Sequence, residues 1–211
     1  ESNRIEGNTL TLRETDLVVN KGLTVGGKSM REHLEAINHY EAILYIRDLT
    51  SRNAMLDERE IRNIHALVLR GIDRDNAGRY RSVPVMISGS RHVPPQPWAV
   101  PKLMEDYSLW LTGESLSLHT VLRAAEAHER LVTIHPFIDG NGRASRLVMN
   151  LILLANGYPI ANIPGDTNSR MAYYSALEKS NLESDKQDFL VLIAGYVLQG
   201  GETLLQRLGA A

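Results

Sequence analysis

The residues of this chain that are best suited to chemistry lie together in the run HPFIDGNGRASR, residues 135–146. The run sits between two segments of strong helical periodicity, which indicates a loop that enters a helix. Gly140 and Gly142 let the backbone approach a ligand closely, and Asn141 is a residue type that caps helices. Free N–H groups at the helix start, together with the helix dipole, favour phosphate. We therefore expect an anionic ligand at this loop.

Four residues of the same run fit a metal-bound phosphate ligand. Arg143 and Arg146 share one face of the first helical turn, where positive charge opposes the dipole unless an anion compensates it. Asp139 precedes the cradle, where a carboxylate would repel phosphates unless a hard cation such as Mg²⁺ lies between them. His135 then remains free to act as a general base, and an ordinary pKa of about 6.5 would leave it largely neutral at cellular pH.

Each of these features alone has an ordinary structural explanation. A His-Pro pair usually ends a helix, Gly-Asn-Gly usually makes a turn, and two arginines on a helix usually face solvent. A simple turn does not require a candidate base, a candidate metal carboxylate, a glycine cradle and paired guanidinium groups together, as they occur within residues 135–146. The combination therefore favours a catalytic function.

The run resembles the Fic signature, His-Pro-Phe-x-Asp-Gly-Asn-Gly-Arg-x-x-Arg, and all of its specified positions are present at 135–146. Residues 2–8, with Ser2, Glu6, Gly7 and Asn8, are similar to the inhibitory motif of Fic proteins that carry it N-terminally. Residues 78–81 and 93–95 resemble the segments that flank the target-docking flap of the family. The resemblance thus extends over most of the chain.

This resemblance implies a protein adenylyltransferase that uses ATP and Mg²⁺. His135 would deprotonate a Ser, Thr or Tyr hydroxyl of a target protein, or of the chain itself, and Asp139 would hold Mg²⁺ on the phosphates. The α- and β-phosphates would lie in a cradle formed by Gly140, Asn141 and Gly142. Arg143 would neutralise the leaving group and Arg146 would anchor the γ-phosphate, so catalysis would rest on positioning and electrostatics.

Further site residues follow from the resemblance alone. Tyr173, Tyr174 and Asn181 match in spacing the residues that line the adenine and ribose pocket of the family. The expected flap pairs with an extended target backbone, a form of strand addition, through Ser88, Gly89, Ser90, Arg91 and His92. Phe137 is expected to anchor the active-site loop in the core instead of touching substrate.

The N-terminal motif implies regulation. Glu6, with Ser2 in the same motif, would pair with Arg146 and occupy the guanidinium that should grip the γ-phosphate, so that activity at rest is low. A change of oligomeric state, such as formation or loss of a homodimer, or a binding partner could release it. The same site could instead favour the reverse reaction, with Glu6 positioning water to remove AMP from a modified target.

Composition sets broad limits on partners and compartment. The chain has 23 Lys and Arg against 25 Asp and Glu. Its formal net charge of -2 therefore gives no overall positive charge that would attract nucleic acid or an anionic membrane. It contains no cysteine, which excludes disulfides, thiolate catalysis and cysteine zinc sites. The apolar stretch 147–160 is too short and too interrupted to span a bilayer. We expect a cytoplasmic protein without a signal peptide that binds neither nucleic acid nor membrane.

The expected elements describe one all-α Fic-type domain over residues 1–211, with a β-hairpin flap at 83–95. Capping signals at Thr11, Ser29 and Asp57 each precede a glutamate by three residues and start helices. Apolar spacing predicts further helices at about 100–111, 118–133, 141–156, 168–179 and 186–198. The inhibitory segment with its helix occupies 1–22, and the active-site loop with its helix occupies 135–156.

Three other functions compete with this interpretation. Residues 22–29 match the P-loop sequence pattern, but a P-loop follows a strand and no strand is expected before them. We therefore expect a loop between helices, which argues against a P-loop NTPase. The remaining histidines show no His-Glu-x-x-His spacing, which argues against a zinc hydrolase. A helical module that binds nucleotide or a partner without turnover is disfavoured by intact His135, Asp139 and Arg146.

Overall fold

The computed structural model describes residues 1–209, and within them every regular element is a helix. The elements run in the order α1 (Ser2–Ile5), α2 (Leu12–Lys21), α3 (Met30–Ser51), α4 (Glu58–Val68), η1 (Pro97–Ala99), α5 (Val100–Thr112), η2 (Glu114–Ser117), α6 (Thr120–Ile134), α7 (Asn141–Ala155), α8 (Thr167–Glu183) and α9 (Gln187–Arg207). The predicted all-α fold class is confirmed.

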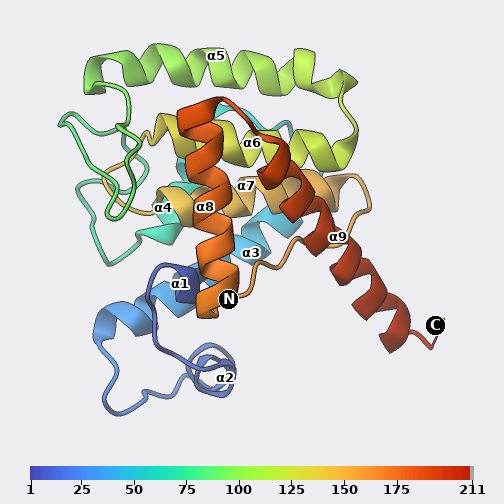
Figure 1. Ribbon diagram of the computed structural model, residues 1–211. Helices are drawn as coiled ribbons and strands as arrows, with labels where there is room; N and C mark the ends of the chain where they lie inside the picture. The colour runs from blue at the N-terminus through green and yellow to red at the C-terminus, as the bar shows by residue number, and fades with distance from the viewer. Residues whose placement is uncertain (210–211) are drawn as a thin grey trace.

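Helix α7 is the centre of the bundle, and α3, α4 and α6 pack around it (Figure 1). Eleven of its 15 residues are buried, which exceeds the single apolar stripe of a surface helix. Helices α8 and α9 cover the α6 side, while α5 lies along the outside of α6. The central position of α7 matters for function because its first turn carries the glycine-containing motif.

The capping signals position the N-terminal helices as predicted. Thr11 and Ser29 each accept the backbone N–H of the glutamate three residues later, and that glutamate accepts the N–H of the cap in return. Asp57 accepts the N–H of Glu60, but this start lacks the reciprocal bond. Between α2 and α3, residues 22–29 form an interhelical loop with no strand before it among residues 1–209, so the P-loop alternative fails on context.

The predicted β-hairpin at 83–95 is wrong. Among the described residues of this segment the backbone forms a turn, in which Ser90 N–H donates to Ile87 O at 3.1 Å, but no strand ladder. Two strands without a third rarely persist in water, and Pro84, Pro94 and Pro95 remove three backbone donors. The flap is instead an extended loop with Gly89 in the left-handed region at φ 76°.

Helix α9 continues to Arg207, nine residues past the predicted end at 198. Gly200 and Gly201 weaken a helix by intrinsic propensity, but here the loop after α7 packs against this turn. Tertiary packing therefore overrides the propensity of the two glycines. By length and composition alone α9 could cross a membrane, and a single helix of this kind is weak evidence for a span.

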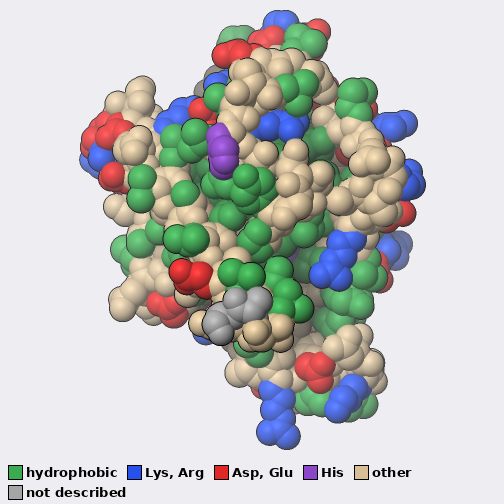
Figure 2. All heavy atoms as spheres, turned by 90° about the vertical axis from the view of Figure 1, so that its right-hand side faces the viewer, with side chains coloured by type: hydrophobic (Ala, Val, Ile, Leu, Met, Phe, Trp, Pro, Cys, Tyr) green, Lys and Arg blue, Asp and Glu red, His purple; other side chains and the backbone are tan. Residues whose placement is uncertain are grey.

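Hydrophobic side chains remain exposed along α9, as Figure 2 shows for the side of the molecule on which this helix lies. They include Val191, Leu198, Leu204 and Leu205, each between 49% and 66% exposed. Apolar side chains scattered over a surface are common in folded proteins. The buried side chains of α9, Phe189, Ile193 and Val197, all lie in its first half, where they join the core around α7.

Replacing Gly200 by alanine should destabilise the fold, whereas Gly201→Ala should not. A Cβ at Gly200 would lie 2.9 Å from the backbone oxygen of Ile160, while the nearest atom to a Cβ at Gly201 is Pro159 Cγ at 3.9 Å. We expect Gly200→Ala to lower the free energy of unfolding by about 1–3 kcal/mol from overpacking. Gly201→Ala should raise it by up to about 1 kcal/mol from helix propensity. Urea denaturation measures both, and equal effects would contradict the packing described here.

Candidate active site

The imidazole of His135 is fixed by the way α6 ends. His135 is the C-terminal cap of α6 and adopts a left-handed conformation at φ 50°, which is uncommon outside glycine. Its Nδ1 lies 3.2 Å from Val132 O, so Nδ1–H donates to that carbonyl and Nε2 carries the free lone pair. The His135 carbonyl accepts Arg81 Nε–H at 2.8 Å. The geometry therefore leaves Nε2 as the atom that can take a proton.

Burial lowers the pKa of His135 to about 4, and the neighbouring Arg81 and His92 side chains add to this effect. The Val132 carbonyl and Glu6 oppose it because both favour the protonated ring. The ordinary pKa expected from sequence is thus corrected downward. A neutral imidazole at pH 7 suits a base, although its lowered pKa makes it a weaker proton acceptor than free histidine.

The loop after His135 is held from inside by two side chains. Asn141 accepts the Phe137 N–H and donates to the Phe137 carbonyl, both at 2.9 Å. The Phe137 ring is fully buried and stacks on His65 at 3.6 Å between ring centroids. His65 in turn donates from Nε2 to Asp139 O at 2.8 Å and accepts Gly78 N–H on Nδ1. The loop is therefore rigid, and Phe137 anchors it as predicted.

Asn141 does not cap α7, which corrects the expectation from sequence. The N-cap is Gly140, in the left-handed region at φ 79°, and no side chain caps the helix. The Asn141 amide is already committed to Phe137, so it cannot also reach the first-turn N–H groups. These groups consequently have no side-chain cap, as an anion cradle requires.

Asp139 sits at the cradle between two guanidinium groups. Its Oδ2 accepts from Arg31 Nη2 at 2.5 Å, and its Oδ1 accepts from Arg143 Nη2 at 3.0 Å. Although burial opposes it, Arg143, the Gly140 N–H and Arg31 hold the pKa of Asp139 below its usual value. The carboxylate is therefore ionised and 42% exposed, with both of its oxygens bonded to arginines in this conformation.

The two signature arginines are buried and neutralised by separate carboxylates. Arg143 is 3% exposed and lies 3.4 Å from Glu35 in addition to its contact with Asp139. Arg146 is also 3% exposed, and its Nη2 donates to Glu6 Oε1 at 2.6 Å. From sequence we expected an anionic ligand to compensate these two arginines. In this conformation carboxylates of the protein itself do so.

Every nitrogen of the Arg146 guanidinium is engaged. Nε donates to Ser2 Oγ at 2.8 Å, Nη2 also donates to Ser2 O at 3.0 Å, and Nη1 donates to Tyr173 OH at 3.2 Å. The carboxylate of Glu6 lies directly over Gly142, where a Cβ would collide with Glu6 Oε1. The N-terminal segment therefore covers the first turn of α7 at Gly142 and, together with Tyr173, engages all three nitrogens of Arg146.

The residues expected around adenine and ribose are not all open to a ligand. Tyr173 is 1% exposed, and its hydroxyl lies 2.9 Å from His128 Nε2, so it supports Arg146 from within the core. Tyr174 is 36% exposed and donates to Ile5 O at 3.0 Å. Asn181 accepts from Thr133 Oγ1 at 2.5 Å. The role predicted for Tyr173 does not fit this conformation, whereas those of Tyr174 and Asn181 stay predictions.

The flap lies against α6 and α8 near His135. Arg91 N–H donates to Glu178 Oε1 at 2.8 Å, and His92 Nε2 donates to Thr133 O at 3.0 Å. Ser88 and Gly89 at its tip are exposed. The flap segment thus borders the base, but the strand that would pair with a target is not formed in this conformation.

Sequence reasoning missed the residues that support the motif from other helices. These are His65 and Arg81, which hold the loop, and Arg31 and Glu35 of α3, which hold the charged groups. No spacing connects them to residues 135–146, because their contacts join segments from 54 to 108 residues apart along the chain. The one usable signal was the position of Arg31 and Glu35 one turn apart on a predicted helix.

Residues 55–153 match the Fic/DOC family. A curated relative from Drosophila grimshawi, named Protein adenylyltransferase Fic, is 42% identical over 191 residues, which cover 90% of this chain and 38% of that protein. The corresponding protein of Drosophila persimilis is 41% identical over the same length. The chain therefore spans less than two fifths of the length of these relatives.

Two solved structures resemble the fold closely. Fic-1 from C. elegans superposes with a TM-score of 0.86 at 34% identity, covering 99% of this chain and 61% of that one. A signaling protein from Bacteroides thetaiotaomicron that contains a Fic domain gives a TM-score of 0.80 at 30% identity, covering 99% of this chain and 81% of that one.

Stability should fall steeply between pH 7 and pH 5 because four histidines, two of them buried and two half-buried, are held in the neutral form. Burial lowers the pKa of His39 to about 3, those of His65 and His135 to about 4, and that of His128 well below its ordinary value. The unfolded chain binds protons below about pH 6.5 while the folded chain excludes them, so stability is lost as pH falls. Each histidine should cost about 2 kcal/mol at pH 5. Urea midpoints at pH 7, 6 and 5 measure this, and a flat profile would contradict it.

Proposed function

This chain belongs to the Fic/DOC family, and we propose that it is a protein adenylyltransferase that transfers AMP from ATP to a hydroxyl of a target protein and is inhibited by its own Glu6. The observation that carries the proposal is the position of His135 at the entrance of the motif loop. Its Nε2 is free and its ring is neutral, next to the uncapped first turn of α7. The proposed general base, His135, and the proposed anion-binding start of α7 are therefore next to each other.

In the proposed reaction, His135 Nε2 takes the proton of the target hydroxyl as its oxygen attacks the α-phosphorus. The new oxygen–phosphorus bond forms while the bond to the bridging β-phosphate oxygen breaks, so pyrophosphate leaves with the electron pair. The Gly140 N–H already donates to Asp139 Oδ1, so the N–H groups of residues 141 and 142 and the Arg143 guanidinium would stabilise the phosphate charge. His135 then returns its proton to solvent, and no covalent intermediate with the protein is needed.

The donor set at Asp139 fits Mg²⁺ that arrives with a nucleotide. Among residues 1–209 no group of three metal-ligating side chains exists, whereas Mg²⁺ usually takes one or two carboxylates together with phosphate oxygens and waters. Asp139 provides such a carboxylate, ionised and partly exposed. Bound there, the ion would neutralise charge on the phosphates.

Inhibition follows from competition for Arg146. If Arg146 is to grip the γ-phosphate, it must first release Glu6 Oε1 and the two oxygens of Ser2. Glu6 also places a negative charge over Gly142, where the phosphates would lie. A nucleotide would therefore bind in a strained or displaced pose, with its α-phosphorus poorly placed for attack from the His135 side.

Glu6→Gly should raise transfer of α-labelled AMP to the protein itself. A coupling of about 1–3 kcal/mol between the ion pair and productive binding corresponds to an increase of about 5- to 150-fold. Label is measured with α-labelled ATP and Mg²⁺, and Glu6→Gln tests whether the charge or the hydrogen bond inhibits. Incubation of labelled protein afterwards reads the reverse reaction, in which AMP would be removed faster with Glu6 present.

In the Glu6→Gly background, His135→Ala should reduce label transfer by about 100-fold or more, the usual worth of a general base. His119→Ala is the matched control, because His119 is exposed at the opposite end of the same helix, where it caps the first turn and contacts Tyr158. Transfer that survives loss of His135 would refute the proposed base. Label from γ-labelled ATP with none from α-labelled ATP would refute adenylyl transfer itself.

A further inference from the structure

Arg31 of α3 occupies the carboxylate that the proposed reaction assigns to Mg²⁺. Its Nη2 donates to Asp139 Oδ2 at 2.5 Å, and its Nε donates to Glu35 Oε1 at 3.1 Å. The other oxygen of Asp139, Oδ1, accepts the Gly140 N–H and Arg143 Nη2. Because a carboxylate oxygen has about two acceptor sites, Oδ1 is saturated and Oδ2 is the oxygen that can take a metal ion.

A metal ion on Asp139 Oδ2 and the Arg31 guanidinium exclude each other, because two cations on one oxygen repel strongly at such a short distance. Arg143 is 3% exposed in α7, whereas Arg31 is 56% exposed on α3, and exposed ion pairs are weak. When Arg31 leaves Asp139, it can keep its bond to Glu35. Arg31 is therefore the group that a metal ion would displace.

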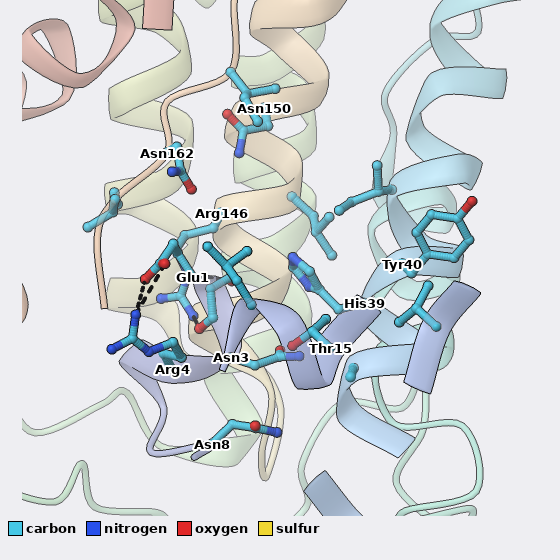
Figure 3. A pocket seen from close by; sticks show the side chains of 18 of the residues that line it. Glu1, Asn3, Arg4, Asn8, Thr15, His39, Tyr40, Arg146, Asn150 and Asn162 are labelled. Carbon is cyan, nitrogen blue, oxygen red and sulfur yellow. Dashed lines mark hydrogen bonds and ion pairs between the residues drawn. The ribbon is translucent and has the colours of Figure 1, made fainter. Parts of the chain in front are cut away.

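Glu35 is a fixed partner for Arg31 because the N-terminal segment holds it. Asn3 donates to the Glu35 carbonyl and Asn8 donates to Glu35 Oε2, both at 2.9 Å. Figure 3 shows Asn3 on α1 and Asn8 on the chain that follows this helix. The Glu35 side chain is 11% exposed and also lies 3.4 Å from Arg143. Arg31 is thus held beside Asp139 by a carboxylate that cannot itself move away freely.

Helix α3 does not explain the positive charge at Arg31. Arg31 is the second residue after the N-cap Ser29, and positive charge in a first turn opposes the helix dipole. The acid that this turn favours is supplied by Glu32, which completes the capping box. The contacts that do favour an arginine here are those with Asp139 and Glu35.

We propose that Arg31 occupies the metal position at Asp139 in the nucleotide-free protein, so that the site selects a divalent ion carried by a nucleotide over the free ion. A free ion would gain one carboxylate oxygen and would have to displace Arg31. An ion that arrives with a nucleotide brings phosphate oxygens as further ligands, and the phosphates gain contacts of their own. Arg31 acts through Asp139 and is a positioning residue.

The selection of nucleotide-bound metal rests on the proposed function, whereas the competition between a metal ion and Arg31 does not. The competition is therefore measured first with Mn²⁺ alone. Mn²⁺ prefers the same oxygen ligands as Mg²⁺, and it broadens the NMR signals of nearby amides.

In labelled Arg31→Gln, Mn²⁺ should broaden the amides of residues 139–142 at a concentration about 3- to 10-fold lower than in the native chain. This range is expected for one charge-assisted hydrogen bond between partly exposed groups. Arg52→Gln is the matched control, because Arg52 is 57% exposed at the other end of α3 and pairs with Asp48 four residues away. This control removes the same charge from the same helix and should bind Mn²⁺ as the native chain does.

Adding Asp139→Asn to Arg31→Gln should abolish the gain, because the ion then loses its carboxylate. The proposal is overturned if Arg31→Gln binds Mn²⁺ no better than the native chain, or if Arg52→Gln gains as much. Broadening that persists in the double variant would overturn it as well, since the ion would then lie elsewhere.

The link to the nucleotide is measured by calorimetry with ATP, in the Glu6→Gly background, with Mg²⁺ and separately with EDTA. Arg31→Gln should bind ATP about 3- to 10-fold more tightly with Mg²⁺ and should show no gain in EDTA. Unchanged or weaker binding with Mg²⁺ would overturn the selection, and weaker binding would identify Arg31 as a phosphate ligand. If ATP binds neither protein, the proposed function fails, and the Mn²⁺ titration still decides whether Arg31 competes with a metal ion.

Discussion

The buried guanidinium of Arg146 is the constraint on which the rest of the site depends. A positive charge that is 3% exposed within the core is stable only when it is paired and hydrogen-bonded. In this structure the partners are Ser2 of α1, Glu6 directly after α1, and Tyr173 of α8, which together use all three nitrogens. These contacts use four of the five guanidinium N–H donors, so under the proposed function a phosphate that binds Arg146 where Glu6 lies must replace the Glu6 carboxylate. Under the proposed function, competition for this one buried cation would link docking of the N-terminal segment to nucleotide binding.

The start of helix α7 carries both Arg146 and the groups that are proposed to bind the phosphates. Arg146 lies one turn beyond Gly142, so the same helix start presents free N–H groups, the Arg143 guanidinium and the Arg146 guanidinium that contacts Glu6. The loop before α7 is held by Asn141, Phe137 and His65, and His135 closes α6 with its Nε2 free. The absence of a side chain at Gly142 admits either the Glu6 carboxylate or a phosphate. Glycine at this position therefore serves both the resting and the proposed active arrangement.

Much of this could be predicted from sequence because the decisive signals are local. The capping residues Thr11 and Ser29, the helical periodicity and the dense motif at 135–146 all depend on neighbours within a few residues, and the contact between Glu6 and Arg146 followed from a second motif. The failures involve tertiary context. Asn141 bonds to Phe137 across its loop instead of capping α7, and the flap lacks a third strand that would stabilise a hairpin. Helix α9 continues through Gly200 because the loop after α7 packs against it. Arg31, Glu35 and His65, which hold the motif loop and its charged groups, lie on helices distant in sequence. Local patterns carry no information on such contacts.

The most direct measurement of the central claim is a pair of crystal structures with Mg²⁺ and a non-hydrolysable ATP analogue, one of the native chain and one of Glu6→Gly. The account predicts that native Arg146 remains on Glu6, with the γ-phosphate elsewhere. In Glu6→Gly, Arg146 should contact the γ-phosphate, and the α-phosphorus should face His135 Nε2. A native structure in which Arg146 binds the γ-phosphate while Glu6 stays in place would contradict competition for this cation.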